Sequence, residues 1–163
     1  MKYSEIKLKT GFTLVELLIV IAVIGILAGG IIAIVNPADQ FKRARDANRK
    51  ADLSQIQKSL EVYYQDREAY PLSSADYKIE GLDWGSSWLP YMGNLPKDPV
   101  SSKNYVYFST GKSYYLYASL DKGVDDPQAC FPDGSKCNNA PDGASCGSGA
   151  VCNYGVSSPN VSP

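Results

Sequence analysis

The most reactive side chains of this sequence are four cysteines in its last third, Cys130, Cys137, Cys146 and Cys152. Cysteine thiolates bind zinc, and pairs of thiols oxidise to disulfides. Zinc sites draw on cysteine pairs of the C-x2-C type or on histidine, and the 163-residue sequence has neither. We therefore predict two disulfides, formed in an oxidising compartment, with all three possible pairings left open.

The lack of histidine also bears on catalysis. It removes the usual general base and the serine–histidine and cysteine–histidine nucleophile pairs, and no constellation of paired carboxylates replaces them. The formal net charge of −1 gives no overall attraction to nucleic acid. The sequence therefore predicts neither an enzyme nor a nucleic-acid-binding protein.

A single carboxylate, Glu16, interrupts an otherwise uncharged apolar segment that extends from Phe12 to Val35. A helix of this length measures roughly 36 Å, which is enough to span a bilayer. A carboxylate inside such a segment costs about 2.5–3.5 kcal/mol on insertion, so it indicates a functional residue. If the chain were cut after Gly11, the new α-amino group of Phe12 would supply a matching positive charge, within one chain or between neighbours.

The apolar segment must hold this acid and its partners in place. Residues 1–11 form a lysine-containing polar leader, typical of the cytoplasmic side of a membrane segment. Gly25, Gly29 and Ala33 are spaced by four residues, so they share one helix face where another helix can approach closely. On residue pattern alone, residues 12–35 are also compatible with an ordinary uncleaved signal anchor.

The run Gly11-Phe12-Thr13-Leu14-Val15-Glu16 resembles the processing site of the type IV prepilin family, which includes type IV pilins and the pseudopilins of type II secretion. In that family a membrane peptidase cuts after the glycine and methylates the new N-terminus. The acid five residues further on helps to register subunits in a filament. The resemblance therefore implies processing at Gly11 and Phe12, and an assembly role for Glu16 with the small residues of its helix.

The same resemblance implies a function, a location and partners. The chain would be a structural subunit of a pilus or pseudopilus that self-assembles into a helical filament through its N-terminal helix. It would first cross the bacterial inner membrane once, with its head outside, and then enter a periplasmic or extracellular filament. A prepilin peptidase, an assembly ATPase and an inner-membrane platform protein would be its partners.

Hydrophobic periodicity predicts the helix that follows the apolar segment. Apolar residues recur at helical spacing from Ala51 to Tyr63, so residues 36–70 are expected to form an amphipathic helix that packs on a small head. This helix would continue the first one, with a kink near Pro37. The stripe is interpreted as core.

The head, residues 71–126, is expected to contain a hairpin. Two strand-like runs, Tyr105–Ser109 and Tyr114–Leu120, flank a turn at residues 110–112. The predicted fold class is therefore α+β, with a long N-terminal helix packed on a small antiparallel sheet. Residues 127–163 would form a disulfide-stapled tail, mobile from Asn153 onward.

The run Leu95-Pro96-Lys97-Asp98-Pro99 ahead of this hairpin is similar to the major pseudopilins of type II secretion. In those proteins a calcium ion sits in the loop after the hairpin, so the resemblance implies calcium at Asp121, Asp125 and Asp126. Carboxylate oxygens suit calcium. The spacing of an EF-hand is absent, and a solvated acidic loop is the alternative.

Two further groups allow more than one interpretation. We expect Trp84, Trp88 and Tyr91 to fill the gap between helix and sheet. An exposed Trp84–Trp88 pair would instead bind sugar, which would make the protein an uncleaved, membrane-anchored binding domain. A basic cluster is interpreted as a solvated helix face, with pairing to acids of a neighbouring subunit as the alternative; it comprises Lys42, Arg43, Arg45, Arg49 and Lys50.

Overall fold

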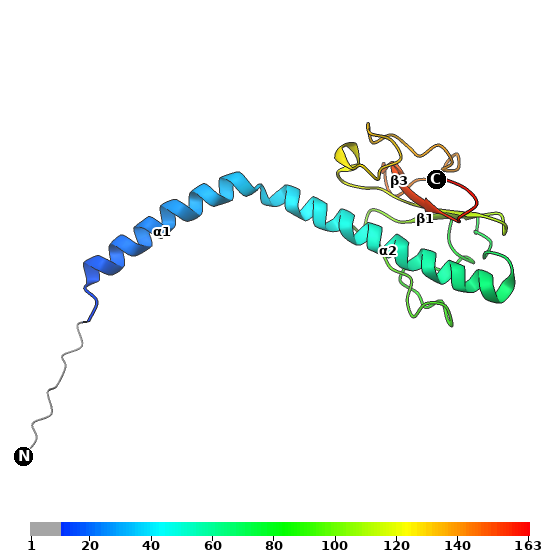
Figure 1. Ribbon diagram of the computed structural model, residues 1–163, viewed down its shortest axis with the longest axis horizontal. Helices are drawn as coiled ribbons and strands as arrows, with labels where there is room; N and C mark the ends of the chain where they lie inside the picture. The colour runs from blue at the N-terminus through cyan, green and yellow to red at the C-terminus, as the bar shows by residue number, and fades with distance from the viewer. Residues whose placement is uncertain (1–10) are drawn as a thin grey trace, which may run out of the picture. The chain divides into compact units, whose positions relative to one another are not determined.

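The computed structural model describes residues 11–163, apart from the side chains at positions 31–35. The predicted leader up to Thr10 lies outside the described residues, as does the side chain of Ala33. The chain divides into two compact units, one ending at Gln40 and the other comprising Phe41–Pro163. The first holds α1 and the first turn of α2, and the second holds the rest of α2 and the head (Figure 1).

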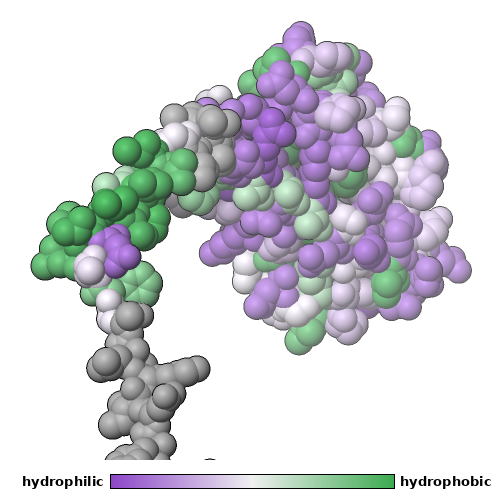
Figure 2. All heavy atoms as spheres, turned by 60° about the vertical axis from the view of Figure 1, so that its left-hand side comes forward, coloured by the Kyte–Doolittle hydropathy of each residue, from purple (hydrophilic) through white to green (hydrophobic). Residues whose placement is uncertain are grey.

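Helix α1, Leu14–Val35, forms from the predicted apolar segment. Its side chains from Leu14 to Leu27 are exposed, and Figure 2 shows hydrophobic side chains gathered along it. Across the residues that the structure describes, no helix combines the length and the hydrophobicity needed to cross a membrane.

The predicted interruption of the long helix lies at Asn36 and Pro37. Asn36 adopts a left-handed backbone conformation with φ of 42° and ψ of 79°, which asparagine tolerates better than most residues. Pro37 then begins α2, Pro37–Arg67, where its missing N–H costs nothing at the first helical position. Helix α2 ends three residues before the end of the predicted range 36–70.

The head contains a three-stranded antiparallel sheet in the order β1-β2-β3. The predicted hairpin is confirmed by β1, Val106–Ser109, and β2, Tyr114–Ala118, with Val106 opposite Tyr117 and Ser109 opposite Tyr114. The third strand, β3 at Tyr154–Ser157, lies in the tail that the sequence predicted to be mobile, so that prediction is wrong. Pairing with β2 orders this short segment, and composition alone does not reveal such pairing. A short 3-10 turn, Gly123–Asp125, follows β2.

Side chains alternate between the two faces of the sheet along each strand, and a different part of the chain packs on each face. Tyr107, Tyr114 and Leu116 point to the face covered by α2, where they join Leu53 and Ile56 in the larger core. On the opposite face, Val106 and Tyr117 pack with the cysteine-rich tail in a smaller cluster that includes Cys137, Cys146 and Cys152. The predicted α+β arrangement of helix on sheet is confirmed.

Hydroxyl groups of the core tyrosines bond to carboxylates that α2 presents. The Tyr105 hydroxyl donates to Asp52 Oδ2 at 2.6 Å, and the Tyr70 and Tyr114 hydroxyls donate to Glu61 at 3.1 Å. Burial, and then the Glu61 carboxylate, raise the pKa of Tyr70 to about 12. These bonds pair three tyrosine hydroxyls of the larger core, whereas the buried hydroxyl of Tyr117, in the smaller cluster, has no partner among the described residues.

The outer edges of the sheet also have partners. On β1, the Tyr107 N–H donates to the carbonyl of Tyr77 at 2.8 Å, and the Ser109 N–H donates to Ser73 Oγ at 3.3 Å. On β3, the carbonyl of Ser157 accepts from the side-chain amide of Gln57 at 2.9 Å.

Candidate functional site

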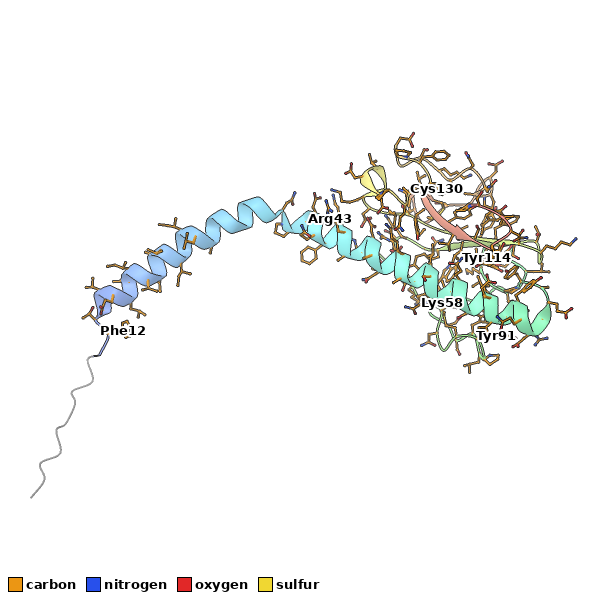
Figure 3. All side chains as sticks on the ribbon, in the orientation of Figure 1. Phe12, Arg43, Lys58, Tyr91, Tyr114 and Cys130 are labelled. Carbon is orange, nitrogen blue, oxygen red and sulfur yellow. A yellow bond between two sulfur atoms is a disulfide. The ribbon has the colours of Figure 1, made fainter. Side chains whose placement is uncertain are left out.

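The predicted cleavage site lies immediately before the first helix. Residues 11–13 are non-helical and exposed, and Phe12 is 90% exposed at the start of the described chain (Figure 3). A peptidase must take its substrate in an extended conformation, and the bond between Gly11 and Phe12 is accessible in that form. The structure thus places both predicted processing residues where cleavage is sterically open.

Glu16 has hydrogen-bonding partners within its own segment, although none of them carries the positive charge that a new amino group at Phe12 would supply. Its carboxylate accepts from the Thr13 N–H at 3.0 Å and from the Thr13 hydroxyl at 2.9 Å, while its own N–H donates to Thr13 Oγ1 at 3.2 Å. This is a capping box, and the Thr-x-x-Glu pattern of residues 13–16 is the signal that sequence reasoning missed. The acid therefore stabilises the first turn of α1 in a single chain.

The small residues of α1 leave their helix face open. A side chain added at Gly25 or Gly29 would find no atom within 4 Å among the described residues. Both positions are exposed, so a second helix can approach this face closely. The third predicted member, Ala33, has its side chain outside the described part of the chain.

Arg49 is the electrostatic centre of the head. Its side chain is 0% exposed, yet its guanidinium bonds to carboxylates from three segments. Nε and Nη2 donate to Asp98 at 2.8 and 3.0 Å, and Nη1 donates to Asp46 at 2.7 Å and lies 3.2 Å from Asp121 Oδ2. Burial alone would lower the pKa of Arg49, but the bonds to Asp98 and the other carboxylates raise it instead. The aspartate of the Pro-Lys-Asp-Pro motif thus anchors its loop to α2.

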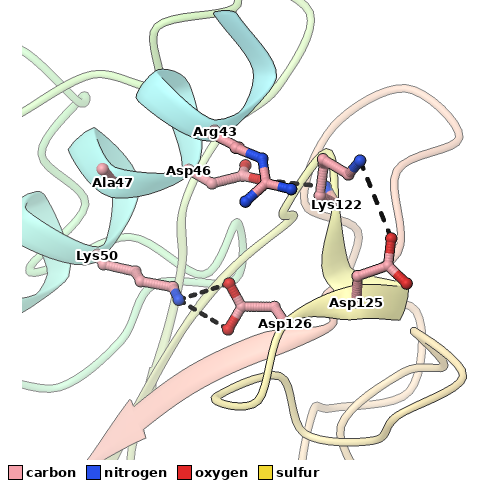
Figure 4. A pocket seen from close by; sticks show the side chains of 7 residues that line it. All are labelled: Arg43, Asp46, Ala47, Lys50, Lys122, Asp125 and Asp126. Atoms are coloured by element: carbon pink, nitrogen blue, oxygen red, sulfur yellow. Dashed lines mark hydrogen bonds and ion pairs between the residues drawn. The ribbon is translucent and has the colours of Figure 1, made fainter. Parts of the chain in front are cut away.

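The loop after β2 is held by further cations. Asp121 accepts from Arg45 Nε and from Lys103 Nζ, each at 2.7 Å. Lys50 Nζ donates to both oxygens of Asp126, at 2.6 and 2.7 Å, as Figure 4 shows. Burial would raise the pKa of both aspartates, but the hydrogen bonds from these cations outweigh it and hold both below the ordinary value.

The solvated-face interpretation of the basic cluster is therefore wrong for three of its five members. Arg45, Arg49 and Lys50 pair with acids of the same chain, whereas Lys42 and Arg43 are exposed. Apart from Asp46, which lies three residues before Arg49, these partners lie 49 to 76 residues further along the chain, so no local pattern predicts them.

The three predicted calcium ligands do not converge. Asp121 and Asp126 are directed at separate cations, and the exposed Asp125 lies 3.9 Å from Lys122 Nζ. In the described part of the chain, no group of three or more acidic, cysteine or histidine side chains is arranged to hold a metal ion. These residues do not fit a calcium site, and calcium binding stays a prediction without support from the geometry.

The four cysteines form two disulfides, Cys130–Cys137 and Cys146–Cys152. The prediction of oxidised cysteines is confirmed, and the structure selects the pairing between sequence neighbours. Both bridges close short loops in the tail that covers the second face of the sheet.

The two tryptophans do not form a sugar-binding platform. Trp88 is 3% exposed, and its indole N–H donates to Glu80 at 3.0 Å. Trp84 packs edge-on against Tyr105, with ring centroids 5.6 Å apart. Both indoles contribute to the core between α2 and the sheet, as we expected for Trp84, Trp88 and Tyr91.

Comparisons with known proteins cover both units of the chain. Residues 6–32 match the prokaryotic N-terminal methylation motif, and residues 36–130 match type II secretion system (T2SS), protein G. The first match includes the exposed bond at Gly11 and the capped Glu16. The second includes α2, the Pro-Lys-Asp-Pro motif and the hairpin.

Individual relatives agree with these matches. The chain is 27% identical over 146 residues to type II secretion system core protein G of Vibrio cholerae, covering 82% of this chain and 87% of the relative. It is 31% identical over 134 residues to core protein G of Pseudomonas aeruginosa, covering 74% and 92%. It is 34% identical over 114 residues to the type IV wide pilus major component PilA4 of Thermus thermophilus, covering 70% and 84%. No solved structure gives a significant match.

Proposed function

This chain belongs to the type II secretion system protein G family, and from that premise we propose that it is cut between Gly11 and Phe12, methylated at Phe12 and assembled through α1. It is a structural subunit of a pilus or pseudopilus. The observation that carries the proposal is the coincidence of the methylation motif with an accessible bond directly before a capped, apolar helix.

The character of α1 supports assembly through this helix. Apart from Glu16, its described side chains are apolar and exposed on every side, and a helix of that kind needs burial in lipid or among other helices. The open face at Gly25 and Gly29 suits close contact with a second copy. We infer that α1 first lies in the inner membrane as a single span and then among identical helices in the filament.

The head supports an extracytoplasmic location. Two disulfides persist only in an oxidising compartment, so the head belongs outside the cytoplasm. A prepilin peptidase, an assembly ATPase and a platform protein would act on the cytoplasmic and membrane side. Proteins of this family are structural components, and the proposal includes no catalytic step.

A secretion pseudopilus is our first choice of filament, because protein G matches residues 36–130 and core proteins G of two organisms cover most of the chain. A wide pilus is the second candidate, since PilA4 is 34% identical over 114 residues. Deleting the gene separates the two. Loss of exported enzymes with surface pili intact supports the pseudopilus, and loss of pili with normal export supports the pilus.

The processing step has a direct test. Mass analysis of membrane-derived protein should give an N-terminal peptide that begins at Phe12 and carries one added methyl group. A peptidase-deficient strain serves as the control and should retain residues 1–11. Mature protein that still begins at Met1, or begins within α1, would contradict the proposal.

A further inference from the structure

We propose that the loop after β2, residues 119–128, is locked onto α2 by side-chain cations that take the place of a metal ion, so that the head keeps this loop closed without calcium. Cations bond to Asp121 and Asp126, and Asp46 bonds to the backbone of the loop. The inference concerns the head alone and does not rest on the proposed filament function.

The carboxylate oxygens that calcium would need are already occupied. On Asp126, Oδ1 accepts from Lys50 Nζ and from the Gln128 N–H, and Oδ2 accepts from Lys50 Nζ. On Asp121, Oδ1 accepts from Lys103 Nζ and Oδ2 from Arg45 Nε. Calcium binds oxygen at about 2.3–2.6 Å, so an ion on Asp126 would lie within about 5 Å of the Lys50 ammonium and be repelled by it.

The backbone of the loop is fixed from the helix as well. Asp46 accepts from the N–H groups of Asp121 and Lys122 at 2.8 and 2.9 Å, and Figure 4 shows this carboxylate between α2 and the loop. Asn153 bonds to both the N–H and the carbonyl of Leu120, at 2.7 and 3.3 Å. These contacts hold the entry to the loop in one conformation.

The charges balance within this lock. Four cations, Arg45, Arg49, Lys50 and Lys103, face four carboxylates, Asp46, Asp98, Asp121 and Asp126. A divalent ion would add two positive charges to a neutral arrangement, and one of the cations would have to leave. Lysine and arginine thus supply the charge that a metal supplies elsewhere.

The first test is calcium itself, added to the full-length chain in detergent micelles. The melting temperature should be the same in excess chelator and in about 5 mM calcium, with equimolar magnesium as the control. A site with a Kd of about 0.1 mM would instead raise it by about 10 °C, because a ligand that binds only the folded state stabilises it. A rise specific to calcium would overturn the inference.

The second test removes one cation. Lys50→Gln should lower the melting temperature by about 4–8 °C, since it leaves the Asp126 carboxylate without its partner. Lys58→Gln on the same helix is the matched control, because Lys58 is exposed, and it should leave the melting temperature unchanged (Figure 3). Equal melting temperatures for the two variants would overturn the inference.

If Lys50→Gln does not fold, calorimetric titration of the unmodified chain with calcium chloride decides the question. Absence of binding heat up to millimolar calcium is the expected result. A saturable binding heat in that range would overturn the inference.

Discussion

Replacing Arg49 with methionine should destabilise the head more than any other single charge removal in α2. Methionine keeps the length of the side chain but provides no donor. Asp46 would retain two backbone N–H partners, and Asp121 would retain Arg45 and Lys103. Asp98 would retain the N–H of Val100 while its side chain stays 1% exposed, so it becomes a buried charge without a cation.

The magnitude follows from that buried charge. Breaking a buried ion pair by removing one partner costs about 3–5 kcal/mol, because the desolvated charge that remains is uncompensated. In a domain of this size such a loss lowers the melting temperature by roughly 10–20 °C. Adding Asp98→Asn to Arg49→Met removes the orphaned charge, so the double variant should be less destabilised than the sum of the single variants.

The control is an ion pair with the same separation and different burial. Lys78 Nζ and Asp83 Oδ1 are 2.7 Å apart, close to the 2.8 Å between Arg49 Nε and Asp98 Oδ2, but the Asp83 side chain is 82% exposed. Lys78→Met should therefore leave the melting temperature unchanged. Melting followed by near-ultraviolet circular dichroism reports the packed tyrosines and tryptophans of the core. The reasoning is refuted if Arg49→Met has the same melting temperature as Lys78→Met. It is also refuted if the effects of Arg49→Met and Asp98→Asn on the melting temperature are additive.

Three further outcomes are expected. Glu16→Gln keeps an acceptor for the capping box but loses the charge. This variant and Glu16→Ala should both be inserted and cleaved normally yet fail to form filaments. Filament yields at the wild-type level after shearing would show that the charge is dispensable. Alkylation without reductant should label none of the four cysteines in exported protein, and full labelling would contradict the bridges. Hydrogen bonds from Lys103 and Lys50 outweigh the effect of burial and depress the pKa of Asp121 and Asp126. The contribution of these two pairs to stability should therefore be complete above about pH 5 and be lost as pH falls through the folded pKa. The melting temperature should fall as pH is lowered from about 5 to about 2, and a flat profile would argue against these pairs.

Local signals in the sequence were sufficient for much of the fold. The helical spacing of apolar residues from Ala51 to Tyr63 and the two strand-like runs that flank residues 110–112 are local signals, and they predicted α2 and the hairpin correctly. The motif at Gly11–Glu16 is equally local, and residues 6–32 match the methylation motif. Such features depend on neighbours within a few residues.

Features that depend on residues far apart in the sequence could not be predicted from local patterns. Strand β3 pairs with β2, with Val156 opposite Leu116, and its run of four residues is too short to be identified as a strand without that partner. Likewise Arg49 meets Asp98 across 49 residues, and a basic cluster on a helix more often remains solvated. The capping role of Glu16 was a different kind of error, because its Thr-x-x-Glu pattern is local and was interpreted only in terms of charge.

The covered edges of the sheet have a consequence for a protein that meets many copies of itself. An open strand edge at high local concentration pairs with the same edge of a neighbour and grows into amyloid-like stacks. The N–H groups of Tyr107 and Ser109 on β1, and the carbonyl of Ser157 on β3, already have partners within the head. Crowded heads therefore offer little template for strand addition, which leaves the proposed contact through the apolar helix α1 without a competing route of growth.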